Sequence, residues 1–371
     1  GYERPMWFAL DGEKAEYEYS YNYQSWYPSA EYETNNTLKN VGLFDLTPFS
    51  KFELKSDIAH QELQKICTAN IKNEPGKCVY THMLNPDGGI ETDLTVVCVE
   101  KNHFRIISSA ATRERDKFHI KKHLSKDIEL KDITDDLCVF GLFGPKSRDL
   151  IKTISKDNFE NNNFKFGTAK YISIEGINVW AQRLSYVGEL GYELYVDLKD
   201  AKKIYELLIE KGKDFNLSNC GMHAMDIMRM ESGFLHWGHD ISPEENQYQA
   251  GLAFTISKKK DVNFIGKDAL EKIKKDKIKS RFAMFTLKDS EPGKPLLLHD
   301  EPIYIDDKII GRSTSGNYSF NFKKNLVFGY INNDLSNDEL QSKNLFIEVE
   351  KQKYPISVQH EPLKLTNFKN L

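Results

Sequence analysis

The sequence lacks three features that would assign it to a functional class at once: paired cysteines, a long apolar run and a surplus of positive charge. Its five cysteines include no CxxC pair, which favours reduced thiols over a disulfide framework or a zinc site. No apolar run approaches the ~20 residues of a membrane helix, and no signal-peptide pattern opens the chain. A net charge of −4 provides no basic field for nucleic acid. We therefore expect no membrane and no nucleic acid as a partner, and a location in the cytoplasm or, in a eukaryote, the mitochondrial matrix.

The chain also lacks the short motifs of the common nucleotide and nucleophile sites. It has no GxGxxG fingerprint, no P-loop and no GxSxG elbow, so it shows no dinucleotide, flavin or triphosphate site of its own. The HWGHD run places His236 and His239 three residues apart beside Asp240. This spacing is not among the stronger zinc signatures and no third ligand accompanies it, so we expect no metal site.

What the chain does contain is typical of a folded protein with more than one domain. Its 371 residues are 40% hydrophobic and 29% charged, and this length favours two or three domains. The first thirty residues are rich in aromatic side chains without a helical or strand period, which predicts an irregular segment that wraps a larger body. The first residue is Gly1 rather than Met, which is consistent with a processed product or with a segment of a longer polypeptide.

The patterns that follow predict strands and helices in alternation. From Val41 an alternating strand extends over VGLFDLTPFSKFELK and leads into a helix over 58–67. Three apolar runs between 78 and 110, separated by NPDGG and EKNH, predict a β-meander, and a helix follows over 113–125. A similar order of strand, turn and helix recurs from LCVFGLFG to a helix that Gly212 would cap. We therefore expect two similar α+β halves.

The remaining patterns favour ordinary structural interpretations. Methionines near helical spacing over 222–228 predict core packing. Short strands separated by turns over 281–360 predict a small all-β terminal domain. Lysines at 258–260 and 274–279 predict a solvated face, and a basic lip for an anionic ligand tail is the alternative.

Two carboxylates at glycine turns are the candidate functional residues. RLSYVGELGYEL places Glu189 at the tip of a tight turn between two glycines, where it is either solvated or directed at a ligand. NPDGGIETDLTV places Asp93 at the start of an apolar strand, where an unpaired carboxylate would be costly. Capping of local backbone amides is the alternative. Arg229 and Asp226, three apart on one predicted helix, pair with each other in the simplest interpretation.

Eight ordered blocks of sequence carry a family resemblance across nearly the whole chain. They read VGLFDLT, YTHMLNPDGGIETDLTV, FGPKS, RLSYVGELGYELY, DIMRMESGFLHWGHDISPEE, AGLAFTI, FIGKDAL and GRSTSGNYS. With these the chain resembles the folate-dependent aminomethyltransferases, the family of the glycine cleavage T-protein. The segments GYERPMWF, HWGHDIS and EPIYIDDKIIGRSTSG are closest in wording to the C-terminal tetrahydrofolate domain of dimethylglycine and sarcosine dehydrogenases.

The resemblance implies an α+β fold, a three-domain cloverleaf around a central folate site with a C-terminal antiparallel β-barrel domain. We divide the chain accordingly into an aromatic-rich N-terminal wrapping segment at 1–35, a first α+β folate-binding half at 36–140, a second at 141–275 and the barrel domain at 276–371.

The resemblance also implies roles for single residues. Asp93 matches the catalytic aspartate, close to the folate nitrogens that receive the one-carbon unit, where a buried carboxylate can stabilise an iminium-like cation. Glu189 matches the glutamate that holds the polar edge of the pterin. The other positions implied to bind the cofactor are Tyr80, Ser109, Ala110, Tyr186, Arg229 and Trp237.

The sequence departs from the T-protein pattern in three places. Thr92 precedes Asp93 where the T-protein carries a second acidic residue, Pro48 and Phe49 replace a His-Met pair, and Ser109 replaces an asparagine of the folate pocket. These changes argue against the lipoyl-protein substrate of the T-protein and leave folate binding as the expectation.

The implied activity is transfer of a one-carbon unit from an N-methylated amine such as dimethylglycine or sarcosine onto tetrahydrofolate, which gives 5,10-methylenetetrahydrofolate. Because the chain shows no flavin fingerprint, the oxidation would need a flavoprotein domain or subunit. Two alternatives remain. One is direct methyl transfer to tetrahydrofolate from a sulfonium such as dimethylsulfoniopropionate, and the other is a non-catalytic folate-binding module, whose characteristic cysteine motif the chain lacks.

Overall fold

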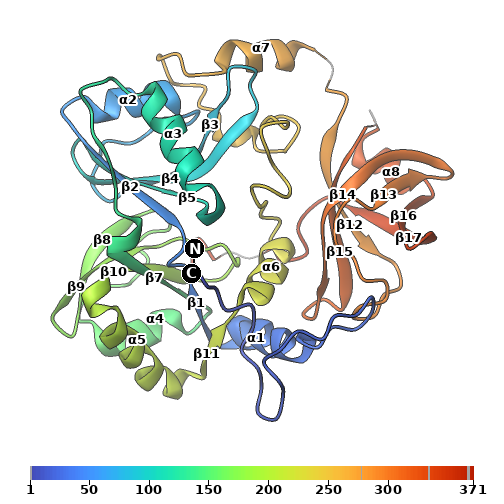
Figure 1. Cartoon of the computed structure of the whole chain (residues 1–371), viewed down its shortest axis with the longest axis horizontal. Coiled ribbons are helices and arrows are strands. Elements are labelled where there is room, and N and C mark those ends of the chain that lie inside the picture. Colours follow the sequence, from blue (N-terminus) through green and yellow to red (C-terminus); the bar gives the residue numbers. More distant parts are fainter. Residues whose placement is uncertain (1, 277, 333–334, 366–367) are drawn as a thin grey trace.

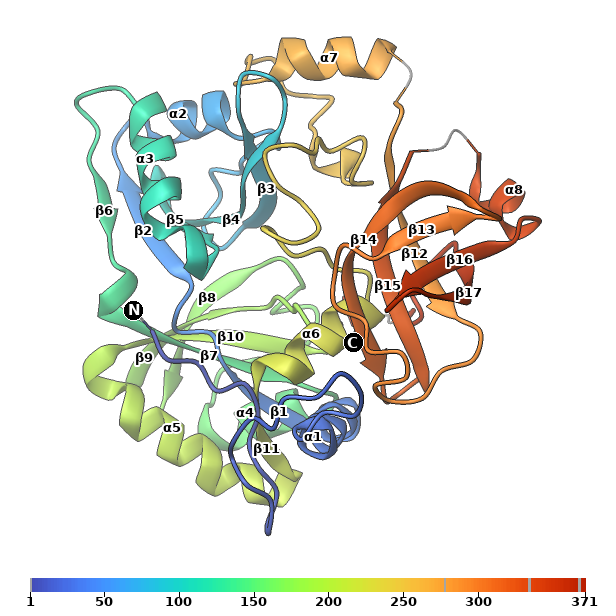
Figure 2. The same cartoon turned by 45° about the vertical axis from the view of Figure 1, so that its right-hand side comes forward.

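The structure, a computed structural model, describes residues 2–276, 278–332, 335–365 and 368–371. Three lobes surround helix α6, Met222–Glu231 (Figures 1 and 2). The first lobe contains a five-stranded sheet, the second a six-stranded sheet and the third a closed barrel. This arrangement confirms the α+β cloverleaf with a C-terminal barrel. Two residues named in the expectations above lie outside the described residues: Gly1, the first residue of the chain, and Lys277, one of the lysines at 274–279.

The sheet of the first lobe has the strand order β3-β4-β5-β2-β6. Its helices α2 and α3 pack on the face that carries Leu94, Val96 and Ile106, so the opposite face is directed at the second lobe. The predicted meander and both predicted helices are confirmed. The elements of this lobe are β2 Ser50–Lys55, α2 Ala59–Ile66, β3 Cys78–Leu84, β4 Ile90–Glu100, β5 His103–Ser108, α3 Arg113–His123 and β6 Leu130–Asp132.

The sheet of the second lobe has the strand order β11-β1-β7-β10-β9-β8. Helices α4 and α5 pack on it through a core that includes Leu43, Leu142, Leu150 and Ile204. The elements are β1 Val41–Asp45, β7 Leu137–Phe143, α4 Ser147–Ile154, β8 Ala169–Ile174, β9 Ile177–Gln182, β10 Gly191–Asp197, α5 Leu198–Gly212 and β11 Leu217–Cys220.

The single strand predicted from Val41 is wrong, because it is two strands in different sheets. β1 lies in the second lobe and β2 in the first. In the turn between them the backbone N–H of Phe49 donates to the carbonyl of Leu46 at 3.1 Å, and Pro48 has no N–H with which to continue a ladder. The second sheet thus takes strands from both sides of residue 140, the predicted boundary between the two α+β halves. The four-part division of the chain stays a prediction.

Two further predictions near helices need correction. Helix α1, Tyr27–Lys39, begins inside the segment predicted to be irregular. Its buried face carries polar residues such as Glu33 and Thr37, so no apolar period marks it in the sequence. Gly212 does not cap α5, because its φ of −64° is helical and the chain continues through a 3-10 turn to Asn216, whose φ of 52° is left-handed.

Six strands close the barrel of the third lobe in the order β12-β15-β14-β13-β16-β17, which confirms the predicted all-β terminal domain. Helix α7, Lys267–Lys275, precedes it, and the short helix α8, Asn337–Gln341, lies within it. The strands are β12 Arg281–Leu287, β13 Pro302–Ile305, β14 Lys308–Ser319, β15 Lys324–Ile331, β16 Leu345–Val349 and β17 Gln352–Gln359.

Helix α6 connects the three lobes. Its buried Met228 packs in one core with Val97 of β4 and Val139 of β7, which confirms the core interpretation of the methionines. At its C-terminal end, Glu231 accepts a hydrogen bond from the Ser319 hydroxyl of β14 at 2.6 Å. Side chains from all three lobes therefore pack against or bind α6, which lies between the lobes in Figure 2.

Candidate functional site

The strand register of the first lobe places three polar side chains on one face. His82 of β3 pairs directly with Asp93 of β4, and Tyr80 lies two residues before His82. Directly opposite residues of an antiparallel pair, and residues two apart in one strand, point to the same side. This is the face opposite α2 and α3, so the three side chains are directed toward the second lobe.

The turn before β4 sets the position of this strand. The Asn85 Oδ1 atom accepts a hydrogen bond from the backbone N–H of Gly89 at 2.9 Å. A Cβ atom on Gly89 would lie 1.8 Å from the carbonyl oxygen of Pro243, so only glycine allows the 242–246 segment to approach so closely. The NPDGG turn is thus held by its own asparagine on one side and by this segment on the other, and the strand of Asp93 starts from it.

Asp93 is mostly buried, with 19% of its side chain exposed. Its Oδ1 atom has no hydrogen-bond partner and lies 3.6 Å from Nε2 of His82, so this oxygen caps no local backbone amide. Burial raises the pKa of Asp93 to about 7, a hydrogen bond with Tyr80 opposes the rise, and the charge of Asp116 adds to it. A carboxyl group with this pKa can bind and release a proton near neutral pH.

Two tyrosines border Asp93. Tyr80 is 39% exposed, so part of this residue is open to a ligand. Tyr186 lies in the segment before β10, where its hydroxyl donates to the carbonyl of Leu235 at 2.9 Å and its ring stacks on Phe234 with centroids 6.0 Å apart. Burial raises the pKa of Tyr186, and the charge of Asp93 contributes to the rise, so Tyr186 lies within electrostatic range of that carboxyl.

Arg229 of α6 is fully surrounded by protein acceptors. Its Nε donates to Asp226 at 2.8 Å, which confirms the predicted pair, and its Nη1 donates to Asp240. Its Nη2 donates to the Ser315 hydroxyl of β14 at 2.9 Å. With 2% of its side chain exposed, Arg229 joins α6, the 236–240 segment and the barrel.

Glu189 lies at a turn, as predicted, but it is not solvated. It lies in a turn that ends where β10 begins at Gly191, and it is 6% exposed. Its carboxylate forms an ion pair with Lys364, which also donates to the carbonyl of Val187 at 3.2 Å. Burial raises the pKa of Glu189 and the charge of Lys364 opposes the rise.

The remaining predicted residues border the strand of Asp93. Ser109 and Ala110 follow β5, which pairs with β4 up to Ser108, and the carbonyl of Ser109 accepts a hydrogen bond from the Ser50 hydroxyl at 2.9 Å. The indole N–H of Trp237 donates to the carbonyl of Ile90, at the start of β4, at 3.1 Å. Tyr80 therefore lies beside Asp93, Tyr186 lies within electrostatic range of it, and Ser109, Ala110 and Trp237 lie along its strand. Glu189 and Arg229 are engaged by protein partners.

Sequence reasoning missed four residues of this region. His82 faces Asp93, and Asp116, which accepts from Thr92 on the α3 side of the sheet, raises the pKa of Asp93 through its charge. Asp240 binds Arg229 and Lys364 binds Glu189. The strand period of two places His82 on the face of Tyr80, and this signal was sufficient to find it. Lys364 pairs with a residue far away in the sequence, so no local pattern indicates it.

The expectations about a metal site, a membrane helix and the exposed lysines can be compared with the part of the chain that the structure describes. There, no cluster of three or more potential metal-ligating side chains occurs, and the rings of His236 and His239 lie 4.6 Å apart. None of its helices is long and apolar enough to cross a membrane. Lys258 and Lys259 are exposed as predicted. Lys260 is not, because its Nζ donates to the carbonyls of Cys67 and Ala69 and burial lowers its pKa to about 8.

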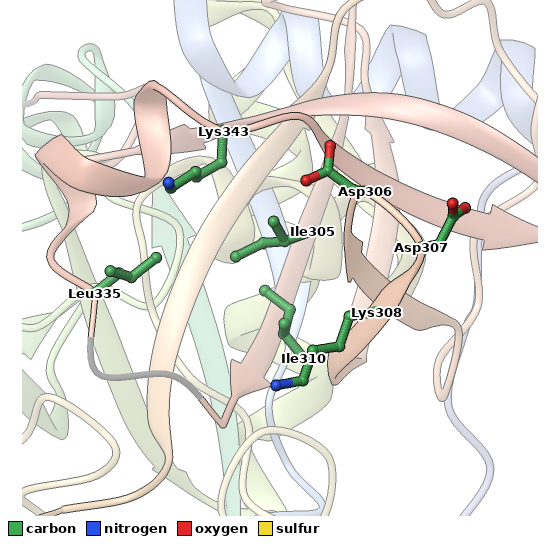
Figure 3. Close-up of a pocket in the computed structure, with 7 residues that line it drawn as sticks. All are labelled: Ile305, Asp306, Asp307, Lys308, Ile310, Leu335 and Lys343. Carbon is green, nitrogen blue, oxygen red and sulfur yellow. The ribbon is translucent and has the colours of Figure 1, made fainter.

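Two cavities lie elsewhere, one in the third lobe and one at its border. One of about 620 Å³ opens at the end of the β13–β14 hairpin (Figure 3). A second, of about 460 Å³, lies between the 245–249 segment and β14. Neither contains a residue that the sequence predicts for the site. The residues that line the first cavity are Ile305, Asp306, Asp307, Lys308, Ile310, Leu335 and Lys343.

Comparison with known proteins finds relatives along the whole chain. The chain is 33% identical over 371 residues to dimethylglycine dehydrogenase of Rattus norvegicus, an alignment that covers 99% of this chain and 42% of the relative. It is 35% identical over 366 residues to 4-methylaminobutanoate oxidase (formaldehyde-forming) of Paenarthrobacter nicotinovorans, which covers 98% of this chain and 43% of the relative. The chain thus spans less than half the length of these curated relatives.

A solved structure has the same fold. The glycine cleavage system aminomethyltransferase T of Bartonella henselae superposes with a TM-score of 0.79 at 19% identity and covers 94% of each chain. The family model of the GCVT N-terminal domain matches residues 1–260, and that of the glycine cleavage T-protein C-terminal barrel domain matches residues 281–364. By these matches the chain belongs to the glycine cleavage T-protein family of aminomethyltransferases, whose members named here are enzymes.

Proposed function

We propose that this chain transfers a one-carbon unit from an N-methylated amine, of the dimethylglycine or sarcosine type, to tetrahydrofolate and so forms 5,10-methylenetetrahydrofolate. The observation that carries the proposal is Asp93, a buried carboxyl group with one oxygen free of hydrogen bonds beside the partly exposed ring of Tyr80. Aminomethyltransferases of this family use tetrahydrofolate, and the relatives reported above are named for methylated amines.

The residues around Asp93 suit a reduced pterin. The exposed part of Tyr80 offers a ring face for stacking, and Asp93 Oδ1 is an unused acceptor for an N–H group or a cation. Glu189 offers carboxylate oxygens to the polar edge of the pterin, while Lys364 keeps it charged. We assign Ser109, Ala110, Tyr186 and Trp237 to the wall of the same site. Arg229 would act by holding this wall, because three of its nitrogens already bind protein acceptors.

Asp93 would act in proton transfer and electrostatic stabilisation. Tetrahydrofolate supplies the two nitrogens that bind the carbon. As the bond between this carbon and the donor amine breaks, the ionised carboxylate would stabilise the cationic carbon-nitrogen group. Asp93 would then take the proton released from a folate nitrogen and return it to the departing amine, so that no net proton is consumed. Its pKa of about 7 suits both halves of this exchange.

Oxidation of the amine is assigned to a flavoprotein component. The relatives named as a dehydrogenase and an oxidase are more than twice as long as this chain, which covers 42% and 43% of them. We propose a flavoprotein domain or subunit as the partner that delivers the oxidised one-carbon unit, with both components in the cytoplasm or the mitochondrial matrix.

The test is one-carbon transfer by the purified chain and its Asp93→Asn variant, with tetrahydrofolate and the oxidised amine supplied by a sarcosine- or dimethylglycine-oxidising flavoprotein. Loss of a preorganised charge typically lowers the rate by about 10²- to 10³-fold, and we expect a loss of this size with folate binding retained. Transfer by the variant at the wild-type rate would remove Asp93 from the mechanism. Folate binding without transfer by the wild type would favour the non-catalytic binding module.

A further inference from the structure

His82 lies directly beside the proposed catalytic carboxyl group and is completely buried. Its Nε2 atom lies 3.3 Å from the Tyr80 hydroxyl and 3.6 Å from Oδ1 of Asp93. Burial lowers the pKa of His82 to about 3, so its imidazole is neutral and carries a single ring proton. The position of that proton decides what His82 presents to Asp93.

The surroundings of the other ring nitrogen place the proton on Nδ1. Nδ1 lies 3.0 Å from the hydroxyl oxygen of Thr255. This hydroxyl donates its one proton to the carbonyl of Leu252 at 2.7 Å, so it can only accept from His82. The amide nitrogen of Gln247 lies 3.3 Å from Nδ1, but its two protons go to the hydroxyls of Thr68 at 3.0 Å and Thr255 at 3.1 Å, so it leaves no proton for Nδ1 to accept. The contact with Thr255 therefore selects the tautomer with Nδ1 protonated and Nε2 bare.

A bare Nε2 changes the hydrogen bonding of Asp93. The lone pair of Nε2 and an ionised carboxylate are both acceptors, and facing acceptors repel. Tyr80 has one hydroxyl proton, which can go either to Nε2 or to Asp93 at a given moment. A proton on Asp93, by contrast, gives Nε2 a donor. Two further ionisable groups interact electrostatically with Asp93, namely Tyr186 and, from the α3 side of the sheet, Asp116. The second carboxylate also disfavours charge on Asp93.

We propose that His82 is a positioning residue that Thr255 holds in the Nδ1-protonated form, so that its bare Nε2 accepts the proton of Asp93 or Tyr80 and keeps Asp93 in proton exchange at neutral pH. No bond to carbon and no electron transfer is involved. The proton moves between oxygen donors and one nitrogen acceptor. This role rests on the proposed function, because it deepens the proton transfer assigned to Asp93.

The first test reads the tautomer without any substrate. Nitrogen NMR of the chain with ¹⁵N-labelled histidine distinguishes protonated from bare ring nitrogens. The signals of His82 are identified by their loss in His82→Gln. We expect Nε2 of the wild type to be bare from pH 6 to 8. In Thr255→Val, which cannot accept from Nδ1, we expect Nε2 to become protonated in part of the molecules. A protonated Nε2 in the wild type would overturn the proposal.

The second test reads the pH dependence of one-carbon transfer. In His82→Gln and Thr255→Val an N–H donor can face Asp93, and this stabilises the carboxylate. The limb of kcat/KM that reports Asp93 should therefore move to lower pH, by about one unit. The buried Thr286 of β12 provides the control Thr286→Val, which should leave the limb unchanged.

The outcomes of the two tests separate two kinds of failure. If His82 had a purely structural role, its variants and those of Thr255 would be slower, but the pH at which kcat/KM changes with the ionisation of Asp93 would not shift. This result would overturn the proposal for His82. Absence of transfer by the wild type with Nε2 bare would instead contradict the proposed function and leave the tautomer established.

Discussion

Buried carboxylates in this protein differ in their partners, and the partner decides the chemistry that each one can perform. Glu189 and Lys364 form a closed pair with 7% and 4% of their side chains exposed, whereas Asp93 keeps an oxygen without a hydrogen bond. A charge without a partner in such a place is expensive unless a ligand or a proton satisfies it. Asp93 therefore keeps an acceptor for a proton or a ligand, whereas Glu189 already has a counter-charge in Lys364.

At this scale we predict the effect of Lys364→Met. The change leaves Glu189 buried without a counter-charge, which typically costs about 3–5 kcal/mol at neutral pH. Because the folded-state pKa of Glu189 is already raised by burial and would rise further, the loss should be small below pH 4 and grow as the pH rises through that pKa. Urea unfolding at pH 4 and pH 8 measures it.

The control for this prediction is Lys199→Met. Lys199 forms a surface ion pair with Asp197 at 3.8 Å, with 77% of its side chain exposed, so its loss should change stability by less than about 0.5 kcal/mol. Equal losses for the two variants, or a loss in Lys364→Met that does not depend on pH, would contradict the ion-pair account.

Single helices and strands can be predicted where the sequence shows both a hydrophobic periodicity and turn residues that mark the ends of the element. The meander over β3, β4 and β5 has apolar strands separated by the turn signals NPDGG and EKNH, and the sequence predicts it. Helix α1 was missed because residues on its buried face, among them Ser29, Glu33 and Thr37, are polar. They are satisfied by hydrogen bonds instead of apolar contacts. The β1–β2 segment alternates like one continuous strand. Its change of sheet at Pro48 depends on tertiary packing, and the alternation of apolar residues does not reveal which sheet a strand joins.

Glu33 of α1 is the basis of the prediction at this scale. Its carboxylate accepts hydrogen bonds from the backbone N–H groups of Gly221 at 2.8 Å and Phe8 at 2.7 Å, which fastens the N-terminal segment to α6. In Glu33→Gln one acceptor oxygen becomes an N–H donor that faces another donor. We expect a loss of about 1–3 kcal/mol in unfolding free energy and faster amide exchange at Phe8.

The exposed neighbour Glu31 supplies the control, because Glu31→Gln should change neither quantity. Amide exchange followed by mass spectrometry and chemical denaturation measure the two effects. Unchanged exchange at Phe8 in Glu33→Gln would show that the N-terminal segment is held by other contacts.

The site that we propose draws on residues that are far apart in the sequence and come from different lobes. Asp93 and Tyr80 come from the first lobe, Tyr186 and Glu189 from the second, and Lys364 from the chain that follows the barrel. The family resemblance predicted most of these residues and the cloverleaf that holds them. The pairing of Glu189 with Lys364, the contacts of Arg229 with Asp240 and the place of His82 follow from how the lobes meet around α6.

The central claim, a tetrahydrofolate site centred on Asp93, is tested most directly by anaerobic calorimetric titration of the chain with tetrahydrofolate, beside its variants Tyr80→Ala, Glu189→Gln and Tyr171→Ala. Tyr171 of β8 is a tyrosine outside the proposed site, 50% exposed. The account predicts saturable one-to-one binding that weakens about tenfold or more in the first two variants, a loss of about 1.4 kcal/mol, and is unchanged in the third. Absence of binding by the folded wild type, or equal binding by all four proteins, would contradict it.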